Sequence, residues 1–462
     1  MTGSALLLSL SAGMACAQPV AATMLIKEGD ALAGSTVSTL NTPFVDGNGK
    51  PGTVVALADS RRVILYNGAP IFTSDQALPD TLTGGEGTMG VGNNGEFIYS
   101  PSFNGEDAVW GQGGLIYASP QLFPNGFPST FHSRPQMVDD GTSHWITGWN
   151  DAGGTSTNKR GLAQRAPNGT VSLLLQGGEA TSSGFNVDAS SAAVQFDFNF
   201  SGNGLHSIVE VELDTGDTNA NNAYLIDLFT VVGKEGDPTG QGDDWDNMDA
   251  PSINNSGDYL FSGDTNGTTT SDEFLAYNSV IQVREGDAVA GVTLGGSCDG
   301  SSLNNLGEAV FVWTISGGGD GLFYASDASN ISGTAVMLLR NGDSIDTTND
   351  GVADWVVTDF NSSQVIGPGL DLGDDGVVWA EVDVDSADGL VTGLEAIIGI
   401  RFRTCPGDWD GSGGQPNSSD FLAYLNDWSA QDPAADLSPP GGDGVWDSSD
   451  FLVYLNLYSQ GC

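Results

Sequence analysis

The last 59 residues carry carboxylates at spacings that suit the oxygen ligands of a calcium ion. An EF-hand loop places ligands at positions 1, 3, 5, 9 and 12, with glycine at position 6 for the sharp turn. In DWDGSGGQPNSSD, Asp408, Asp410 and Ser412 occupy positions 1, 3 and 5, and Asp420 falls at position 13. This first loop therefore has one residue more than the standard spacing.

A second candidate loop lies ahead of the end of the chain. In DGVWDSSD, Asp443, Asp447 and Asp450 fit positions 5, 9 and 12. The earlier ligand would be Asp436, which the insertion SPPG places three residues too far upstream. Because calcium takes about six to eight oxygens and tolerates irregular geometry, we predict calcium as a cofactor of this segment.

Each loop runs into a copy of one phrase, SSDFLAYLNDW from Ser418 and SSDFLVYLNLY from Ser448. From Phe421 the large apolar residues recur at i, i+3, i+4 and i+7, which is one face of a helix, and the second copy repeats the pattern. Helices this short are marginal alone, so each needs the apolar face of its twin. The sequence predicts a small α-helical module with paired calcium loops at residues 404–462.

This module resembles a dockerin of the type that ends in Gly-Cys. The resemblance covers residues 404–462 and rests on the two SSDFL copies, on CPGDWDGSG and on the terminal GC. In dockerins the calcium loops fold the module, and the residue pair just before the last ligand faces a cohesin partner. The resemblance therefore implies a cohesin-like or cell-surface partner that contacts Ser418, Ser419, Ser448 and Ser449.

The N-terminus predicts a signal peptide over residues 1–17. An apolar run from Ala5 to Leu10 leads into the cleavage pattern Ala-Cys-Ala before Gln18, although a basic region ahead of the run is missing. No other segment has the ~18 apolar residues that a membrane-spanning helix needs. We therefore expect a secreted or cell-surface protein with no transmembrane segment in the mature chain.

Three cysteines remain after the predicted cleavage. An oxidising compartment allows a disulfide between Cys405 and Cys462, which would join the two ends of the C-terminal module. Cys298 is then left over, and the sequence assigns it no role.

The region between these ends contains a repeat. A pair of small polar residues, a glycine and an apolar run recur at seven glycines: Gly49, Gly95, Gly141, Gly204, Gly257, Gly307 and Gly376. Asn-Gly and Asp-Gly pairs favour turns that begin a strand. The spacing of 46, 46, 63, 53, 50 and 69 residues is near the period of a four-stranded propeller blade. The copies resemble secreted bacterial tandem-repeat proteins named for an NxxGxxAF motif, which implies a β-propeller-like fold without a settled activity.

The two ends of the repeat region complement each other. MLIKEGDALAG at Met24 matches IQVREGDAVAG at Ile281, whereas the last unit lacks this phrase. An N-terminal strand that completes the last repeat would close a ring and leave no free sheet edge. We predict a mainly β protein: a seven-bladed β-propeller at residues 18–403, closed by an N-terminal strand and followed by the helical module. An open solenoid or two sandwiches are the alternatives.

A third acidic loop lies within the propeller region. In DTTNDGVAD, Asp346, Thr348, Asp350 and Asp354 match positions 1, 3, 5 and 9 of a calcium loop, and an acidic β-turn explains the same residues. The acidic cluster GDDWDNMD, which begins at Gly242, is weaker, because most such clusters are solvated loops.

Composition and the motif search limit the function. The 59 acidic and 13 basic residues give a formal net charge of -46, which repels nucleic acid and anionic membranes. The three histidines lack metal-ligand spacing, and no nucleophile-elbow motif occurs. We therefore predict a secreted or cell-surface, non-catalytic binding or display protein, with a glycan among its possible ligands. The alternative is a propeller enzyme acting on extracellular polysaccharide, as a glycoside hydrolase or lyase.

Overall fold

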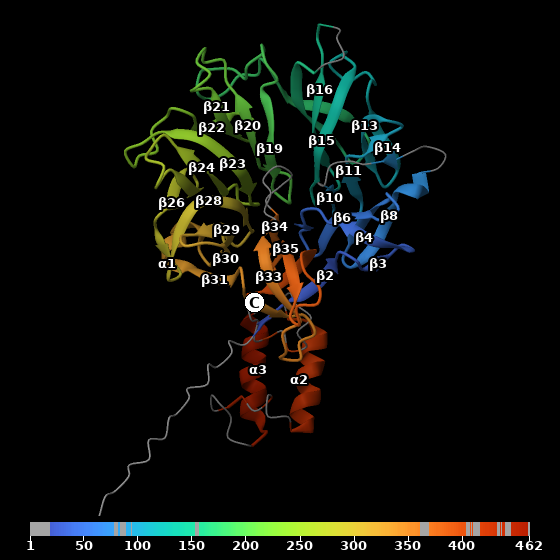
Figure 1. The fold of residues 1–462 in the computed structure, drawn as a ribbon, viewed down its shortest axis with the longest axis vertical. Helices are drawn as coiled ribbons and strands as arrows, with labels where there is room; N and C mark the ends of the chain where they lie inside the picture. Colours follow the sequence, from blue (N-terminus) through green and yellow to red (C-terminus); the bar gives the residue numbers. More distant parts are fainter. Residues whose placement is uncertain are drawn as a thin grey trace, which may run out of the picture.

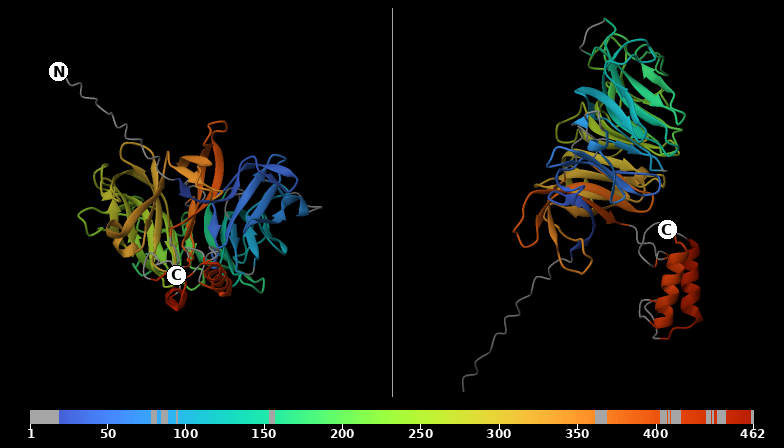
Figure 2. Two further views of the ribbon diagram at one scale, coloured as in Figure 1. Left: turned by 90° about the horizontal axis from the view of Figure 1, so that it is seen from below. Right: turned by 90° about the vertical axis from the view of Figure 1, so that its right-hand side faces the viewer.

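The structure, a computed structural model, describes residues 19–77, 82–83, 89–93, 95–152, 157–360, 369–402, 407, 409, 416–431, 435, 437–438 and 445–460. Its described strands form seven sheets arranged around an axis, and two helices lie outside this ring (Figure 1). Figure 2 shows the ring and the helix pair from two further sides.

Three sheets built from consecutive strands follow the N-terminal segment. The first contains β3 (Ala31–Leu32), β4 (Ser35–Thr39), β5 (Phe44–Val45), β6 (Pro51–Leu57), β7 (Arg62–Tyr66) and β8 (Ala69–Thr73). The second contains β9 (Leu82–Thr83), β10 (Met89–Val91), β11 (Phe97–Tyr99), β12 (Ser102–Phe103), β13 (Glu106–Gly111) and β14 (Gly114–Ala118). The third contains β15 (Ser129–Met137), β16 (Ser143–Trp149), β17 (Lys159–Arg165) and β18 (Val171–Gln176).

Three more sheets of consecutive strands complete the series. The fourth contains β19 (Val194–Phe200), β20 (Ser207–Glu212), β21 (Asn222–Ile226) and β22 (Thr230–Lys234). The fifth contains β23 (Trp245–Ile253), β24 (Tyr259–Thr265), β25 (Glu273–Tyr277) and β26 (Val280–Arg284). The sixth contains β27 (Ala288–Val289), β28 (Val292–Leu303), β29 (Ala309–Ile315), β30 (Asp320–Ala325) and β31 (Ala335–Arg340). Short helical turns occur at η1 (Ser74–Ala77), η2 (Ala328–Asn330) and α1 (Ile331–Thr334).

The remaining sheet, which we call the closing sheet, joins both ends of the propeller region. It contains β1 (Val20–Ala21), β2 (Thr23–Lys27), β32 (Ser344–Asp346), β33 (Trp355–Phe360), β34 (Leu370–Leu372), β35 (Val377–Ser386) and β36 (Leu394–Arg401). The segment at Met24 lies here, because β2 pairs with β36 in antiparallel register. β1 pairs in parallel with β32.

The fold-class prediction needs correction in two respects. The propeller ring has six blades, each of consecutive strands, and the closing sheet is a seven-stranded composite of both chain ends rather than a seventh blade of the same kind. The physical reason is that the last repeat supplies too few outer strands, so the two edge strands of this sheet, β1 and β2, come from the N-terminal segment. Second, the described residues of the helical segment contain no group of three His, Cys, Asp or Glu side chains that could hold a metal, so they give no calcium-loop module.

The helical segment consists of α2 (Ser418–Ala430) and α3 (Ser448–Gln460). Tyr424 and Tyr454 are fully buried and stack with ring centroids 4.0 Å apart. The Trp409 ring packs edge-on against Tyr424 at 4.9 Å. The predicted pairing of two amphipathic helices through their aromatic faces is therefore present.

Apolar side chains fill the spaces between neighbouring sheets. One cluster, for example, joins Ile146 and Leu162 of the third sheet to Val209 and Leu225 of the fourth. The strands in the middle of each sheet are covered on both faces, and every residue of β6 and of β16 is buried. Burial of apolar surface at about 25 cal/mol per Å² is the main force that holds the sheets against one another.

Seven hairpin turns, which we call the inner turns, join the innermost strand of each sheet to the strand that follows it. The glycines predicted from the repeat occupy the same position in all seven, with φ between 68° and 86°. Each of these glycine N–H groups donates to the carbonyl three residues earlier, as from Gly257 to Asn254 at 3.0 Å. Glycine adopts this left-handed backbone without a steric penalty, which explains why it recurs.

The first asparagine of the NNxG copies holds its own turn and reaches the next one. The Asn304 Oδ1 atom accepts the N–H groups of Leu306 and Glu308 at 3.1 and 3.0 Å. Its Nδ2 atom donates to Glu308 Oε2 at 2.7 Å and to the Gly373 carbonyl of the next inner turn at 3.4 Å. A single buried side chain thus fixes two turns of neighbouring sheets.

The second residue of the motif continues this connection around the axis. The N–H groups of Asn255 and Asn305 each donate at 2.8 Å to the side-chain oxygen of the second residue in the following turn, ending at Asp374. The N–H group of Asn203, the third residue of its own turn, donates to Asn255 Oδ1 at the same distance. The motif therefore joins successive sheets in addition to forming a turn.

We predict that Asn304→Ala lowers the free energy of unfolding by about 2–3 kcal/mol, because it leaves buried N–H groups without acceptors. The matched control is Asn168→Ala, which removes one exposed turn bond that Thr170 N–H donates to Asn168 Oδ1 and should cost less than about 0.5 kcal/mol. Urea unfolding of the whole chain measures both. Equal losses in the two variants would contradict the connecting role of Asn304.

Candidate functional site

A cavity of about 280 Å³ lies on the propeller axis, beside the inner turns. Every one of the seven sheets contributes to its wall through its innermost strand or the turn that follows. The described lining comprises residues 42–47, 89–91, 134–137, 139, 196–200, 202, 250–254, 301–305 and 370–374. A concave site built from many converging strands is the usual place for a small ligand.

Irregular backbone directs several side chains towards this cavity. The pairing of β15 with β16 shifts register between Ser133 and Gln136, and Arg134 within the bulge has φ of 50°. The pairing of β23 with β24 shifts between Asp249 and Ser252, with Ala250 at φ 48°. A β-bulge re-aims side chains, and such bulges are common beside functional sites.

The charged groups of the cavity wall are mostly carboxylates. The described lining contains Asp46, Asp139, Asp197, Asp371 and Asp374, together with a single basic residue, Arg134. Arg134 Nη1 lies 2.6 Å from Asp197 Oδ1. Burial raises the pKa of Asp197, and the neighbouring Arg134 guanidinium opposes this rise.

Three of these carboxylates accept hydrogen bonds that fix their orientation. Asp371 accepts the N–H groups of Val45 and Leu372 at 2.7 and 2.8 Å, and the Ser302 hydroxyl at 2.8 Å. Asp46 accepts the N–H groups of Asn48 and Lys50 and the Tyr66 hydroxyl. Asp374 accepts the main-chain and side-chain N–H groups of Asn305.

Asp139 occupies a different position, at the turn after β15. A Cβ atom built on Gly47 would lie 2.6 Å from Asp139 Oδ1, so the glycine leaves the space that this carboxylate fills. Burial raises the Asp139 pKa, and the negative charges of Asp46, Asp140 and Asp374 raise it further. Asp139 is thus a carboxyl group on which one carboxylate of its own turn and one from each of two other turns act with like charge.

Phenyl rings form the apolar part of the wall. Phe44, Phe196, Phe198 and Phe200 all line the cavity. The guanidinium of Arg160 lies 4.5 Å from the centroid of the Phe196 ring. The cavity therefore combines hydrogen-bond acceptors with aromatic surface, an arrangement that suits a small ligand with several donor groups and some apolar surface.

Most of the predicted calcium ligands and both cysteines of the predicted disulfide lie outside the described residues. These are Asp408, Asp410, Ser412, Asp436, Asp443, Cys405 and Cys462. Calcium binding by this segment and the disulfide therefore stay predictions. Cys298 is described and is buried in β28.

The last carboxylate of each predicted loop, Asp420 or Asp450, caps the helix that follows it. Asp420 accepts the Asn417 N–H at 2.8 Å and completes a capping box at the start of α2. Asp450 accepts the Asp447 N–H at 2.8 Å through Oδ2, and the Leu437 and Ser438 N–H groups through Oδ1. Asp447 in turn accepts the Ser449 N–H at 2.7 Å. These bonds satisfy orphan donors at the helix N-termini.

The third acidic loop is also closed by its own backbone. Asp346 accepts N–H groups from Asn349 and Gly351, each at 2.7 Å, and more weakly from Thr348 and Asp350. Asp354 accepts the Thr347 and Thr348 N–H groups. These contacts account for both carboxylates as turn acceptors, and the described residues gather no metal-binding group here.

The predicted partner-contacting residues share one environment. Ser418, Ser419, Ser448 and Ser449 are all exposed at the first turns of α2 and α3. Leu422 and Leu452, one turn further along each helix, are exposed as well. The two helices thus present the same side chains twice, which leaves the predicted partner role open to a direct test.

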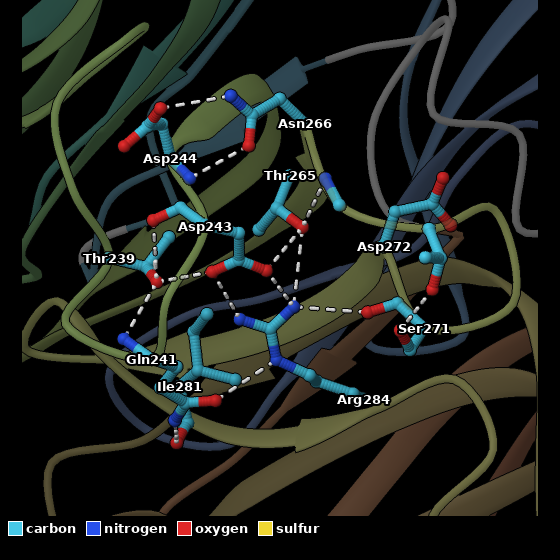
Figure 3. A network of polar contacts seen from close by, with 12 residues as sticks. Thr239, Gln241, Asp243, Asp244, Thr265, Asn266, Ser271, Asp272, Ile281 and Arg284 are labelled. Carbon is cyan, nitrogen blue, oxygen red and sulfur yellow. Dashed lines mark hydrogen bonds and ion pairs between the residues drawn. The ribbon is translucent and has the colours of Figure 1, made fainter.

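A polar network in the fifth sheet accounts for the acidic cluster near Gly242 (Figure 3). Arg284 binds both oxygens of Asp243, with Nη1 2.8 Å from Oδ2 and Nη2 3.0 Å from Oδ1. Arg284 also donates to the Gln241 side chain and to the Ser271 carbonyl at 3.0 Å each. The network ties the loop ahead of β23 to β26, so it is structural.

The sequence did not identify the axial cavity. It placed the inner turns correctly, and those turns mark one end of the cavity, but Arg134, Asp197 and Asp371 belong to no motif. The one signal that could have pointed to them is the position of each residue just ahead of an inner turn. Among the described residues no helix is long and apolar enough to cross a membrane.

Comparison with known proteins gives remote similarities only. No protein-family model matches the chain, and no curated protein matches it. Among solved structures, the β-propeller domain of the Trilobed protease from Pyrococcus furiosus shares 10% identity over 79% of this chain and 96% of that chain, with a TM-score of 0.43. The polysaccharide lyase Uly1 shares 8% identity over 81% of this chain and 91% of that chain, with a TM-score of 0.42.

A third similar structure is the alpha-L-arabinanase of Penicillium chrysogenum complexed with arabinobiose. It shares 12% identity over 78% of this chain and 98% of that chain, with a TM-score of 0.35. All three TM-scores are below 0.5, so these similarities carry no argument about activity. The propeller assignment rests on the sheet topology of the chain itself.

We predict that Arg284→Ala lowers the free energy of unfolding by about 2 kcal/mol, because it leaves a half-buried carboxylate without its bidentate partner. Arg340→Ala is the control, since Arg340 is 55% exposed in its 3.6 Å pair with Asp343, against 13% for Arg284. Exposed pairs contribute about 0–1 kcal/mol. Urea unfolding measures the free energy of unfolding of both variants. Similar losses would show that the Arg284 network contributes no more to stability than an exposed ion pair.

A second prediction concerns the pH dependence of α3. Burial tends to raise the Asp450 pKa, but the N–H groups of Asp447, Ser438 and Leu437 outweigh it and hold the pKa below its usual value. A lowered pKa in the folded state gives stability that is present above the usual value of about 4 and is lost as pH falls through the folded-state pKa. The protection factors for amide hydrogen exchange in residues 445–460 should therefore fall on acidification, and Asp450→Ala should lower them at neutral pH. Ser449→Ala, an exposed neighbour, should not.

Proposed function

We propose that this chain is a non-catalytic binding protein displayed outside the cell, whose propeller takes a small ligand in the axial cavity. The observation that carries the proposal is the cavity itself, to which all seven sheets contribute lining residues. A wall built from so many strands is rigid, and a rigid, preformed site binds without the cost of ordering loops.

The bonding of the cavity carboxylates supports binding over catalysis. Asp46, Asp371 and Asp374 each accept hydrogen bonds from neighbouring turns or strands, so they hold the ring together as well as facing the cavity. General acids and bases need freedom to gain and lose a proton during a reaction. Carboxylates that are fixed by backbone donors are better suited to orient hydroxyl or ammonium groups of a ligand.

One observation favours the enzyme alternative, a glycoside hydrolase or lyase acting on extracellular polysaccharide. Such enzymes pair a carboxyl group of raised pKa with an ionised carboxylate. Asp139 has a raised pKa and lies close enough to Asp46 and Asp374 to be affected by their charges. This second candidate is therefore tested in the same experiment as the first.

Display outside the cell is the second half of the proposal. We infer export from the N-terminal signal pattern, and we infer docking from the repeated serine pairs of α2 and α3. The exposure of Ser418, Ser419, Ser448 and Ser449 supports a contact with a cohesin-like or cell-surface partner. In this arrangement the helices hold the protein in place while the propeller cavity faces the medium.

We predict that the whole chain binds one or more members of a panel of small sugars, polyols and amines in saturation-transfer NMR, and that no product forms. Thr42→Trp places a large ring at the cavity wall and should abolish binding. Thr36→Trp makes the same change at an exposed position of β4 and should not. Binding that survives Thr42→Trp would exclude the cavity as the site, and cleavage of a polysaccharide by the wild type would favour the enzyme.

A further inference from the structure

We propose that the ligand of the axial cavity is a small organic cation that carries a primary ammonium group and binds beside Asp139. This inference rests on the proposed function, because it assigns a ligand class to the same cavity. It goes further, since the cavity alone is compatible with neutral sugars and polyols.

The charges of the wall exclude an anionic ligand. Five carboxylates and one guanidinium belong to the described part of the cavity lining, a formal balance of five negative charges against one positive. The one base, Arg134, already pairs with Asp197 at 2.6 Å, so it offers little attraction to an anion. Negative potential in a concave, partly desolvated site is stronger than on an open surface and concentrates cations.

The arrangement of these carboxylates favours an organic cation over a bare metal ion. In the part of the chain that the structure describes, no three carboxylates converge closely enough to hold a metal. The negative charges are instead spread around the axis, on the turns after β5, β15 and β34. An ammonium group with three N–H donors on a carbon skeleton can reach separated acceptors, which a single ion cannot do.

Asp139 is the carboxylate whose ionised form such a ligand would stabilise most. Asp46, Asp140 and Asp374 act on it with like charge and, together with burial, raise its pKa. The Gly47 N–H is the stabilising contact from the backbone. A cation at this point would offset the mutual repulsion of three turns, in addition to making its own hydrogen bonds.

The wall also contains a buried hydroxyl without a partner. Ser301, on β28, is 1% exposed, lines the cavity, and its Oγ atom makes no hydrogen bond within the described structure. A buried hydroxyl left unsatisfied costs about 1–3 kcal/mol. This observation is independent of the carboxylates, and it indicates that the cavity lacks a polar group that a ligand or water would supply.

The proposed contact makes binding depend on pH. The Asp139 pKa is raised in the free protein by burial and by Asp46, Asp140 and Asp374. An ammonium neighbour favours the ionised form and lowers this pKa, so binding releases a proton. Affinity should therefore be full above the raised pKa and should fall as pH decreases through it. High ionic strength should weaken binding as well.

Titration calorimetry with two matched probe pairs tests the inference on the whole chain. The pairs are 1,4-diaminobutane with 1,4-butanediol, and glucosamine with glucose, each of which compares an amine with a hydroxyl on the same skeleton. We expect each amine to bind roughly tenfold tighter than its hydroxyl partner, which corresponds to about 1.4 kcal/mol. Asp139→Asn should remove this preference, and Asp246→Asn, which removes one exposed charge from β23, should keep it.

The outcomes separate the ligand class from the proposed function. Equal or tighter binding of the diol or of glucose, lost in Thr42→Trp, would overturn the ammonium assignment and leave the cavity as the binding site. Amine binding that Asp139→Asn does not change would overturn the assignment too, because it would reflect only the overall acidity of the surface. If no probe binds, the ammonium assignment fails, and the NMR panel then decides separately whether the cavity binds anything.

Discussion

The fold depends on the hydrogen bonds by which successive inner turns hold one another. The side-chain oxygens of Asn255, Asn305 and Asp374 accept backbone N–H groups from the preceding turn, and Asn304 spans two turns from a buried position. Apolar packing presses the sheets together but is not directional. The turn-to-turn bonds supply the angular order that keeps the sheets around a common axis, and the axial cavity exists because that order holds.

The sequence predicted the parts of the fold that depend on local chemistry. Gly257 and its counterparts stand in turns because only glycine takes that backbone without strain, and Tyr424 and Tyr454 meet because helical spacing puts them on one face. The number of blades could not be settled this way, because the composition of the closing sheet is decided by pairing between segments far apart in the chain. The alternation of turn and strand along the sequence does not indicate which distant segments pair in the closing sheet.

The candidate site was less predictable, for a related reason. Arg134 reaches the cavity through a bulge in β15, and Asp371 faces it through a strand of only three residues. Neither lies in a recognisable spacing, because the ring brings together residues that are separated by more than 200 positions. The acidic loops show the converse. Asp346 and Asp450 have the spacing of metal ligands, but the same short-range geometry lets their oxygens accept nearby N–H groups.

The pairing of β2 with β36 has a consequence for the order of events during synthesis. Thr23 meets Gly399, a separation of 376 residues (399 minus 23). At about 5–20 residues per second, the ribosome needs tens of seconds to add that length, so β2 emerges long before its partner exists. The ring can close only when nearly the whole propeller has left the ribosome. An unpaired strand invites pairing with another chain in that interval, and a protein that crosses a membrane before it folds would close its ring on the far side.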